Sequence, residues 1–367
     1  MRKLSHPERG FLLFSAVTLA VGLSTVRASA KVSGVCGNCH TMHNSQDGAA
    51  IMHSGDGAGW AADGTFTSGT ATDTPVGYLL IANCVGCHSS TTADQTIIQL
   101  GENRIPIVFN TAGYPADALA GGNFYQVSQG TDYDGYGHNV YGISEIDTKL
   151  SAAPGNTRCS GIASSCHNTL AVAPGGHNYD RGGCQGCHFS VYHHQDNDEY
   201  RFLNSHDEPQ GAYVQGVEHD SWEHPDHTTA TDHNFYKGVD KLAAGGHDGV
   251  DLRTTHGISS YCGGCHNAFH NNDGTGTDVW LRHPTDIVLP EEGEYAAYNP
   301  VTGYEIQSPV AWINPATPQR DEAIVMCLSC HRVHGSPYPD ILRWDYSEMI
   351  ADEPNGDGCF VCHTTKD

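Results

Sequence analysis

Residues 326–334 read M-C-L-S-C-H-R-V-H, so Cys327 and Cys330 stand three positions apart and His331 follows at once. The pattern C-x-x-C-H is typical of the covalent attachment of c-type haem. Each thiol can form a thioether with one vinyl group of the haem, and the adjacent histidine can bind the iron. These nine residues therefore predict a haem cofactor at this point of the chain.

The rest of the chain repeats this unit. Complete copies consist of Cys36, Cys39 and His40, of Cys84, Cys87 and His88, of Cys184, Cys187 and His188, of Cys262, Cys265 and His266, and of Cys359, Cys362 and His363. All 14 cysteines of the chain fall into pairs that end in Cys-His, if a stretched copy is included. Neither disulfides nor four-cysteine zinc sites require a histidine after each second cysteine. The repeat therefore indicates several c-type haems.

The stretched copy consists of Cys159, Cys166 and His167, with six residues between the cysteines. The intervening residues can loop out while both thiols and the histidine still reach one haem. A disulfide between Cys159 and Cys166 is the alternative in an exported protein. We expect a haem here, which makes seven in total, or six if the disulfide forms.

The N-terminal residues 1–30 have the composition of a signal peptide. Arg2, Lys3 and Arg9 precede an apolar run over 11–23, and Ala28-Ser29-Ala30 fits a cleavage site. The run is too short for a membrane span, and no cysteine follows directly to carry a lipid. We therefore expect residues 31–367 to form one exported multihaem region without a membrane span, extracellular or at the cell surface, with the periplasm as the alternative.

The composition is acidic and poor in apolar residues. The chain has 42 Asp and Glu against 18 Lys and Arg, a formal net charge of −24. Such a surface argues against nucleic acid as a partner and favours cationic partners or metal ions. Apolar residues make up 38% and there are 43 glycines, so a conventional core is under-supplied. We expect mostly irregular coil, with short helices and a few short strands, wrapped around a stack of haems.

Few regular elements can be predicted. Residues 104–110 favour a short strand, 295–306 a hairpin, and 340–350 a helix capped by Asp340. The segment of about 195–261 contains no cysteine but many histidines, and we expect it to bind no haem covalently.

Each haem iron needs a second, distal ligand in addition to the histidine of its motif. Five methionines are too few to serve every haem, whereas 24 histidines suffice, so we predict bis-histidine ligation throughout. The candidates lie near a motif or alone in Gly- or Pro-flanked loops: His43, His138, His177, His270, His283, His334, and either His193 or His194, of which we selected His194. A histidine three or four residues after a motif histidine cannot reach the far side of the same iron, so it would bind a neighbouring haem.

Several segments resemble extracellular multihaem c-type cytochromes of Geobacter-type metal-reducing bacteria, including the filament-forming, nanowire members. They are C-G-N-C-H-T-M-H-N-S at 36–45, G-H-N-V at 137–140, W-L-R-H-P at 280–284, C-L-S-C-H-R-V-H at 327–334, L-R-W-D-Y at 342–346 and V-C-H-T-T-K-D at 361–367. The resemblance implies a continuous stack of bis-histidine haems, little secondary structure, and electron export to minerals such as metal oxides or to redox partners. It also implies that His43 binds the haem at Cys327, Cys330 and His331 of a neighbouring copy, which would make a homopolymer. The stretched motif and the His-rich segment depart from the filament-forming pattern.

Two functions are compatible with these motifs. The first is electron transfer without catalysis, as a carrier or a filament subunit. The alternative is a multihaem reductase with one open haem. The surplus of histidines and the absence of a C-x-x-C-K motif favour electron transfer, and we expect no enzymatic activity.

Overall fold

The structure is a computed structural model. It describes residues 35–36, 45–46, 49–50, 53–54, 70–71, 84–100, 103–150, 152–155, 170–172, 182–189, 191–194, 199–204, 211–223, 231–243, 252–271, 283–351, 353 and 355–365. The signal peptide predicted for residues 1–30 lies outside these residues.

The described chain is mostly irregular, as the sequence predicts. The α-helices are α1 (Val85–His88), α2 (Leu252–Thr255), α3 (Ile258–Cys262), α4 (Asn267–Asn271) and α5 (Cys359–Cys362). The 3-10 turns are Val127–Gln129, Thr131–Tyr136, Gly183–Gly186, Tyr200–Phe202, Gly293–Tyr295, Arg320–Glu322, Cys327–Ser329, Pro339–Ile341 and Tyr346–Glu348. Several of these one-turn elements coincide with a C-x-x-C-H motif, so the motifs themselves supply much of the helical structure.

Most strands pair in two-stranded ladders. They are β1 (Ser45–Gln46) with β2 (Ala49–Ala50), β3 (His53–Ser54) with β4 (Thr70–Ala71), β5 (Ser89–Ser90) with β8 (Phe109–Asn110), and β6 (Ile97–Leu100) with β7 (Asn103–Pro106). Only β5 and β8 run parallel among them. The strand predicted over 104–110 is thus split between β7 and β8, which belong to different ladders.

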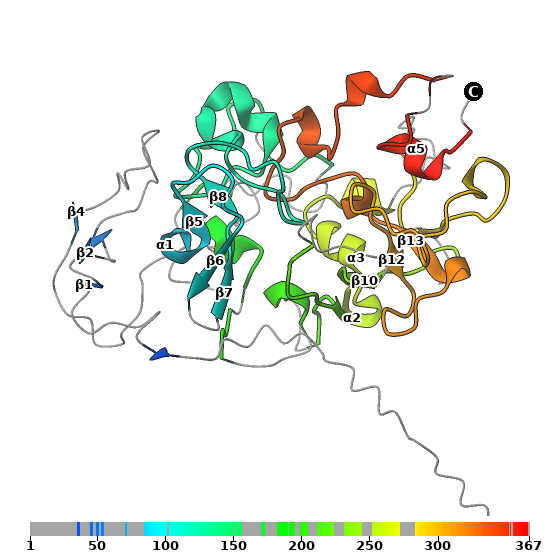
Figure 1. The fold of residues 1–367 in the computed structure, drawn as a ribbon, viewed down its shortest axis with the longest axis horizontal. Helices are drawn as coiled ribbons and strands as arrows, with labels where there is room; N and C mark the ends of the chain where they lie inside the picture. The colour runs from blue at the N-terminus through cyan, green and yellow to red at the C-terminus, as the bar shows by residue number, and fades with distance from the viewer. Residues whose placement is uncertain are drawn as a thin grey trace, which may run out of the picture.

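One larger sheet lies on the other side of the molecule from β5–β8 (Figure 1). Its order is β11 (Ile287–Val288), β13 (Ala323–Val325), β12 (Ala311–Trp312), β10 (Phe235–Lys237) and β9 (Gly216–Val217). β10 and β12 are parallel and the other neighbours are antiparallel. Because β13 ends at Val325, the sheet fixes the start of the motif at Cys327.

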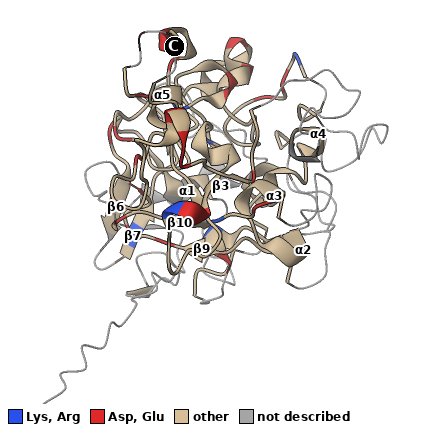
Figure 2. Ribbon diagram, turned by 90° about the vertical axis from the view of Figure 1, so that its right-hand side faces the viewer, with Lys and Arg blue, Asp and Glu red and all other residues tan. Residues whose placement is uncertain are grey.

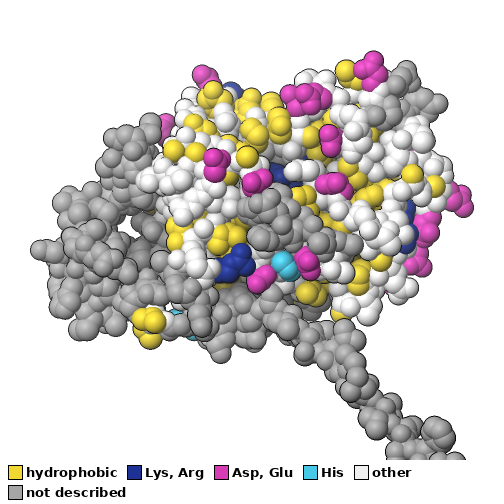
Figure 3. Space-filling view, viewed as in Figure 1, with side chains coloured by type: hydrophobic (Ala, Val, Ile, Leu, Met, Phe, Trp, Pro, Cys, Tyr) yellow, Lys and Arg dark blue, Asp and Glu magenta, His cyan; other side chains and the backbone are white. Residues whose placement is uncertain are grey.

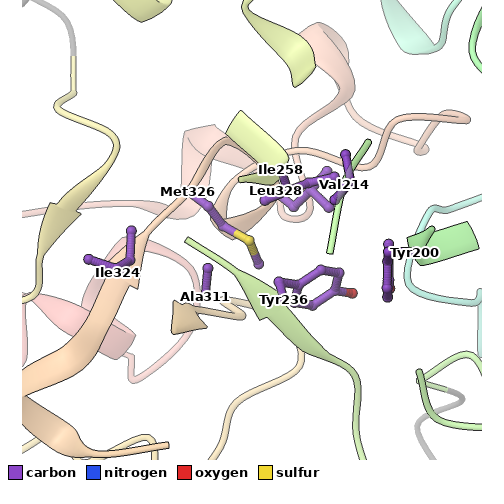
Figure 4. Close-up of a cluster of buried hydrophobic side chains, with 8 residues drawn as sticks. All are labelled: Tyr200, Val214, Tyr236, Ile258, Ala311, Ile324, Met326 and Leu328. Carbon is purple, nitrogen blue, oxygen red and sulfur yellow. The ribbon is translucent and has the colours of Figure 1, made fainter. Parts of the chain in front are cut away.

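A protein core accompanies this sheet. Figure 4 shows side chains from separate segments meeting around Tyr236, and Met326 and Leu328 beside Cys327 are among them. The cluster comprises Tyr200, Val214, Tyr236, Ile258, Ala311, Ile324, Met326 and Leu328. Burial of these groups stabilises the sheet through the hydrophobic effect. The expectation of an under-supplied core is therefore incomplete, since buried apolar clusters also form within residues 85–143 and 289–361.

Two local predictions are wrong. The region 340–350 forms short 3-10 turns at Pro339–Ile341 and Tyr346–Glu348 instead of a helix, and Asp340 has a positive φ of 58° inside the first turn. Residues 295–306 form turns in place of a hairpin, as Gly303 N donates to Asn299 O at 2.9 Å. In both cases a spacing of aromatic and apolar residues reflects packing between segments instead of a regular element.

Acidic side chains are spread over the described surface, whereas lysines and arginines are few (Figures 2 and 3). This distribution agrees with the composition and shows no basic face on the views drawn. Among the described residues, no helix combines the length and the apolar character that a membrane crossing requires.

Candidate haem-binding sites

Each of the five C-x-x-C-H motifs at residues 84–88, 184–188, 262–266, 327–331 and 359–363 forms one tight turn. The backbone N–H of the motif histidine donates to the carbonyl of the first cysteine, with distances of 2.8–3.1 Å. In His188, for example, the amide lies 2.8 Å from Cys184 O. The turn holds both thiols and the imidazole in one compact unit, as attachment to a single haem requires.

Distant backbone segments orient the motif imidazoles. Nδ1 donates to a carbonyl oxygen in four of them: His88 to Pro106 at 2.9 Å, His188 to Arg201 at 2.8 Å, His266 to Pro154 at 2.9 Å and His331 to Asp340 at 2.9 Å. In the fifth motif, His363 Nδ1 lies 3.1 Å from Glu294 Oε1. A ring that donates through Nδ1 keeps the Nε2 lone pair for a metal.

Burial also favours the metal-binding form of these rings. It lowers the pKa of His88, His188, His266 and His331, because a charged imidazolium is poorly solvated inside the protein. The neutral imidazole that results is the form that ligates iron.

Four motif histidines face a second histidine at nearly the same separation. The ring centres are 6.2 Å apart for His88 and His193, 6.2 Å for His188 and His334, 6.2 Å for His266 and His138, and 6.0 Å for His363 and His283. In each pair one ring belongs to a C-x-x-C-H motif and the other comes from a different segment of the chain.

This spacing fits haem iron. A bond from a first-row metal to imidazole nitrogen is about 2 Å long and the ring centre lies about 1 Å behind the nitrogen, so two imidazoles on opposite sides of one iron have centres about 6 Å apart. The angle between the ring planes varies from 17° to 89°. This range is compatible with ligation of one iron by both rings, because each ring can rotate about its bond to the metal. The four pairs therefore fit a haem held between two histidines.

The position of His334 depends on neighbouring glycines. Its backbone N–H donates to Gly121 O at 2.8 Å, and a Cβ added to Gly121 would lie 2.8 Å from His334 Nδ1. Gly122 has φ +81° and pairs with Gly335 in a parallel bridge. Glycine at 121 thus leaves the space in which the imidazole faces His188, and glycine at 122 allows the close approach of the backbone at Gly335. Burial beside His188 lowers the pKa of His334 to about 3, so the ring is neutral.

The attachment sites form a chain of neighbours. The Cys84 side chain lies beside that of Cys184, and the Cys262 side chain lies beside that of Cys327. The motif at 184–188 meets the next one through Tyr261, whose hydroxyl donates to Cys187 O at 2.5 Å. Cys327 N donates to Ser259 Oγ in α3 at 3.2 Å. The first four described motifs are therefore linked one to the next, and Gly358, which precedes the last motif, lies against Trp344, the residue after Arg343.

The C-terminal part of the chain matches a known family. Residues 320–367 match the family model described as "Doubled CXXCH motif", which contains the motifs at 327–331 and 359–363. This match confirms the haem-attachment motifs predicted there and supports c-type haem as the cofactor. Together with the repeated motif, it supports a multihaem c-type cytochrome.

Two solved structures are similar to most of the chain. The first is "Outer Membrane Cytochrome S Filament from Geobacter Sulfurreducens", with 19% identity and a TM-score of 0.43, covering 87% of this chain and 85% of the other. The second shows OmcS nanowires from Geobacter sulfurreducens, with 19% identity and a TM-score of 0.42, covering 89% and 87%. Both agree with the resemblance stated above. No curated protein matches the chain.

Several predicted site residues lie outside the described part of the chain. These are Cys39, His40, His43, Cys159, Cys166, His167 and His177, together with the side chains of Cys87 and His270. Cys36 is described and exposed. The number of haems and the choice between haem and disulfide at Cys159 and Cys166 therefore stay predictions.

The structure adds detail that the sequence did not supply. It places His193, of the two adjacent histidines, opposite His88, whereas the role of His194 stays a prediction. His256, which we did not select, donates through Nδ1 to Tyr213 O at 2.8 Å, the same arrangement as in the motif histidines. No local sequence pattern identifies His256 as a candidate ligand, because the carbonyl that its ring donates to lies 43 residues away in the chain. Among the described residues, no histidine ring faces His331 as in the four pairs.

Proposed function

We propose that this chain carries electrons along a row of c-type haems, each ligated by two histidines, and that it is not an enzyme. The haem supplies one-electron redox chemistry when bound. The protein's residues attach it, orient its ligands and exclude water. Cys-His motifs hold one side of each haem, and His138, His193, His283 and His334 supply distal ligands.

The four histidine pairs carry this proposal. A reductase needs an iron with an open or weakly held position, whereas four of the five described motif histidines already face a second imidazole at 6.0–6.2 Å. Contact between the first four described motifs adds support, because electron transfer along a protein needs neighbouring haems.

The mass and the spin state of the purified holoprotein test the proposal. We expect an intact mass that corresponds to seven covalent haems; six haems and a reducible crosslink between Cys159 and Cys166 would favour the disulfide. In the EPR spectrum of the oxidised protein we expect low-spin ferric haem, with at most one high-spin haem at His331. High-spin signals from several haems would contradict bis-histidine ligation.

We further propose that the protein is exported and polymerises head to tail. His331 is oriented by Asp340 O like the other motif histidines, yet no ring faces it among the described residues. A histidine of another copy, which the resemblance identifies as His43, would complete this site. Such a contact does not close on itself, so it produces a filament. Cationic groups or metal oxides suit the acidic surface as further partners.

A further inference from the structure

Two buried arginines adjoin the motif at 327–331. Arg332 follows His331 directly and is 6% exposed, and Arg343 is 5% exposed. The backbone N–H of Arg343 donates to Cys330 O at 2.9 Å, and its Nε donates to Leu328 O at 2.6 Å. The Arg343 guanidinium therefore lies against the turn that carries the two attachment cysteines.

The hydrogen-bond partners of both guanidiniums are neutral. Arg332 donates to the carbonyls of Ala118 and Leu119 and to the side-chain oxygen of Gln307. Arg343 also donates to the carbonyls of Ile306 and Ala120. Within the described part of the chain, neither forms an ion pair. These contacts satisfy the N–H groups but leave two positive charges inside the protein.

No acidic side chain of the described residues contacts either guanidinium. Glu223 is buried, but its oxygens accept hydrogen bonds from Tyr236 and Tyr304, both at 2.8 Å, and burial raises its pKa. Asp340 is exposed, so water and salt screen its carboxylate. Two buried guanidiniums without an ion-pair partner among the described residues therefore adjoin the motif at 327–331.

The C-terminal motif has a carboxylate beside its histidine. His363 Nδ1 lies 3.1 Å from the carboxylate of Glu294, and both side chains are about one-fifth exposed, at 21% and 22%. The carboxylate therefore brings negative charge close to a ligating imidazole. Arg320 also lies near this motif, where it donates to the carbonyls of Leu289, Pro290 and Tyr298 and, at 3.5 Å, to that of Tyr295 beside Glu294.

These charges act on the redox equilibrium of a bound haem. Ferric haem carries one more positive charge than ferrous haem, so a buried guanidinium nearby disfavours the ferric form. A carboxylate on the ligand favours it. Second-sphere charge and hydrogen bonding are established ways by which a protein sets haem potential.

Building on the proposed function, we propose that Arg332 and Arg343 raise the reduction potential of the haem at Cys327, Cys330 and His331 above that of the C-terminal haem. Electrons on the C-terminal haem then pass favourably to its neighbour. Electron transfer between the last two haems is therefore favoured in one direction, away from the C-terminal haem.

Three arginine variants and one glutamate variant test the assignment. R343Q removes the charge, R343K keeps it with fewer hydrogen bonds, and R104Q is a control that removes an arginine paired with Asp220 at 3.5 Å. E294Q neutralises the carboxylate at His363. The holoproteins are titrated electrochemically, and NMR of the haem methyl groups gives the ferric-to-ferrous ratio of each haem at a fixed potential.

We expect R343Q to raise this ratio about tenfold for one haem, which is 59 mV for a one-electron couple. R343K and R104Q should change it less than about twofold, and E294Q should lower the ratio of a different haem. Equal shifts in R343Q and R343K, or no shift, would overturn the proposal. The proposal also requires an order of reduction potentials in the unaltered protein. If the haem that R343Q affects has the lower reduction potential of the two, and the haem that E294Q affects the higher, the proposal is wrong. Intact mass separates these outcomes from haem loss, which would count against the proposed function instead.

Discussion

Replacing His334 with alanine isolates one predicted distal ligand. The ring is buried, its centre lies 6.2 Å from that of His188, and Gly121 packs against it. Removing it leaves the iron at His188 without its second imidazole, so we expect high-spin ferric haem to increase by one haem per chain, about one seventh of the total. Loss of the buried side chain should also cost about 2–5 kcal/mol of stability, as for other large-to-alanine changes in cores.

EPR and absorption spectra of the oxidised holoprotein measure the high-spin fraction. Added imidazole should enter the space that His334 vacates and restore the low-spin spectrum. His219→Ala is the matched control, because His219 is hydrogen-bonded to Ser221 and faces no motif histidine in the described chain. A double change of His334 and His138 should give two high-spin haems. If the single variant stays fully low-spin and loses only stability, the pairing of His188 with His334 is refuted.

Two further predictions concern the whole chain. The apoprotein should be unfolded, because the Gly-rich, polar chain cannot offset its conformational entropy with the apolar clusters alone; a protease-resistant apoprotein with native-like near-ultraviolet circular dichroism would contradict this. His43→Ala should abolish filaments and leave one additional high-spin haem per chain, seen by electron microscopy and EPR. An unaltered protein that stays monomeric at high concentration with every haem low-spin would exclude the intermolecular ligand.

The sequence predicts the haem motifs well because their chemistry is local. Two thiols and an imidazole must reach one cofactor, so Cys327, Cys330 and His331 stay together in the chain and remain recognisable. The structure adds to this spacing short hydrogen bonds within each turn, among them one from the histidine N–H to the first cysteine carbonyl. Mostly irregular structure also follows from the composition, because glycine is abundant and apolar periodicity is rare.

Distal pairings are harder to predict because they depend on the path of the chain. His138 meets His266 across more than a hundred residues, and only the fold decides between His193 and His194 opposite His88. The predicted helix at 340–350 failed for a similar reason. Asp340 presents its carbonyl to His331, and Arg343 donates to Cys330, so motif contacts take the place of helical hydrogen bonds.

The motif contacts explain why a chain with so little regular structure can hold a row of cofactors. A row of haems needs fixed neighbours more than it needs long helices or strands. Cys84 meets Cys184, Tyr261 joins the next motif to Cys187, and Cys262 meets Cys327. Distal histidines add a second connection, since His334 follows one motif and faces the histidine of another. Each bound haem would therefore join two or more distant segments of the chain. These links would hold the fold together where regular secondary structure is sparse.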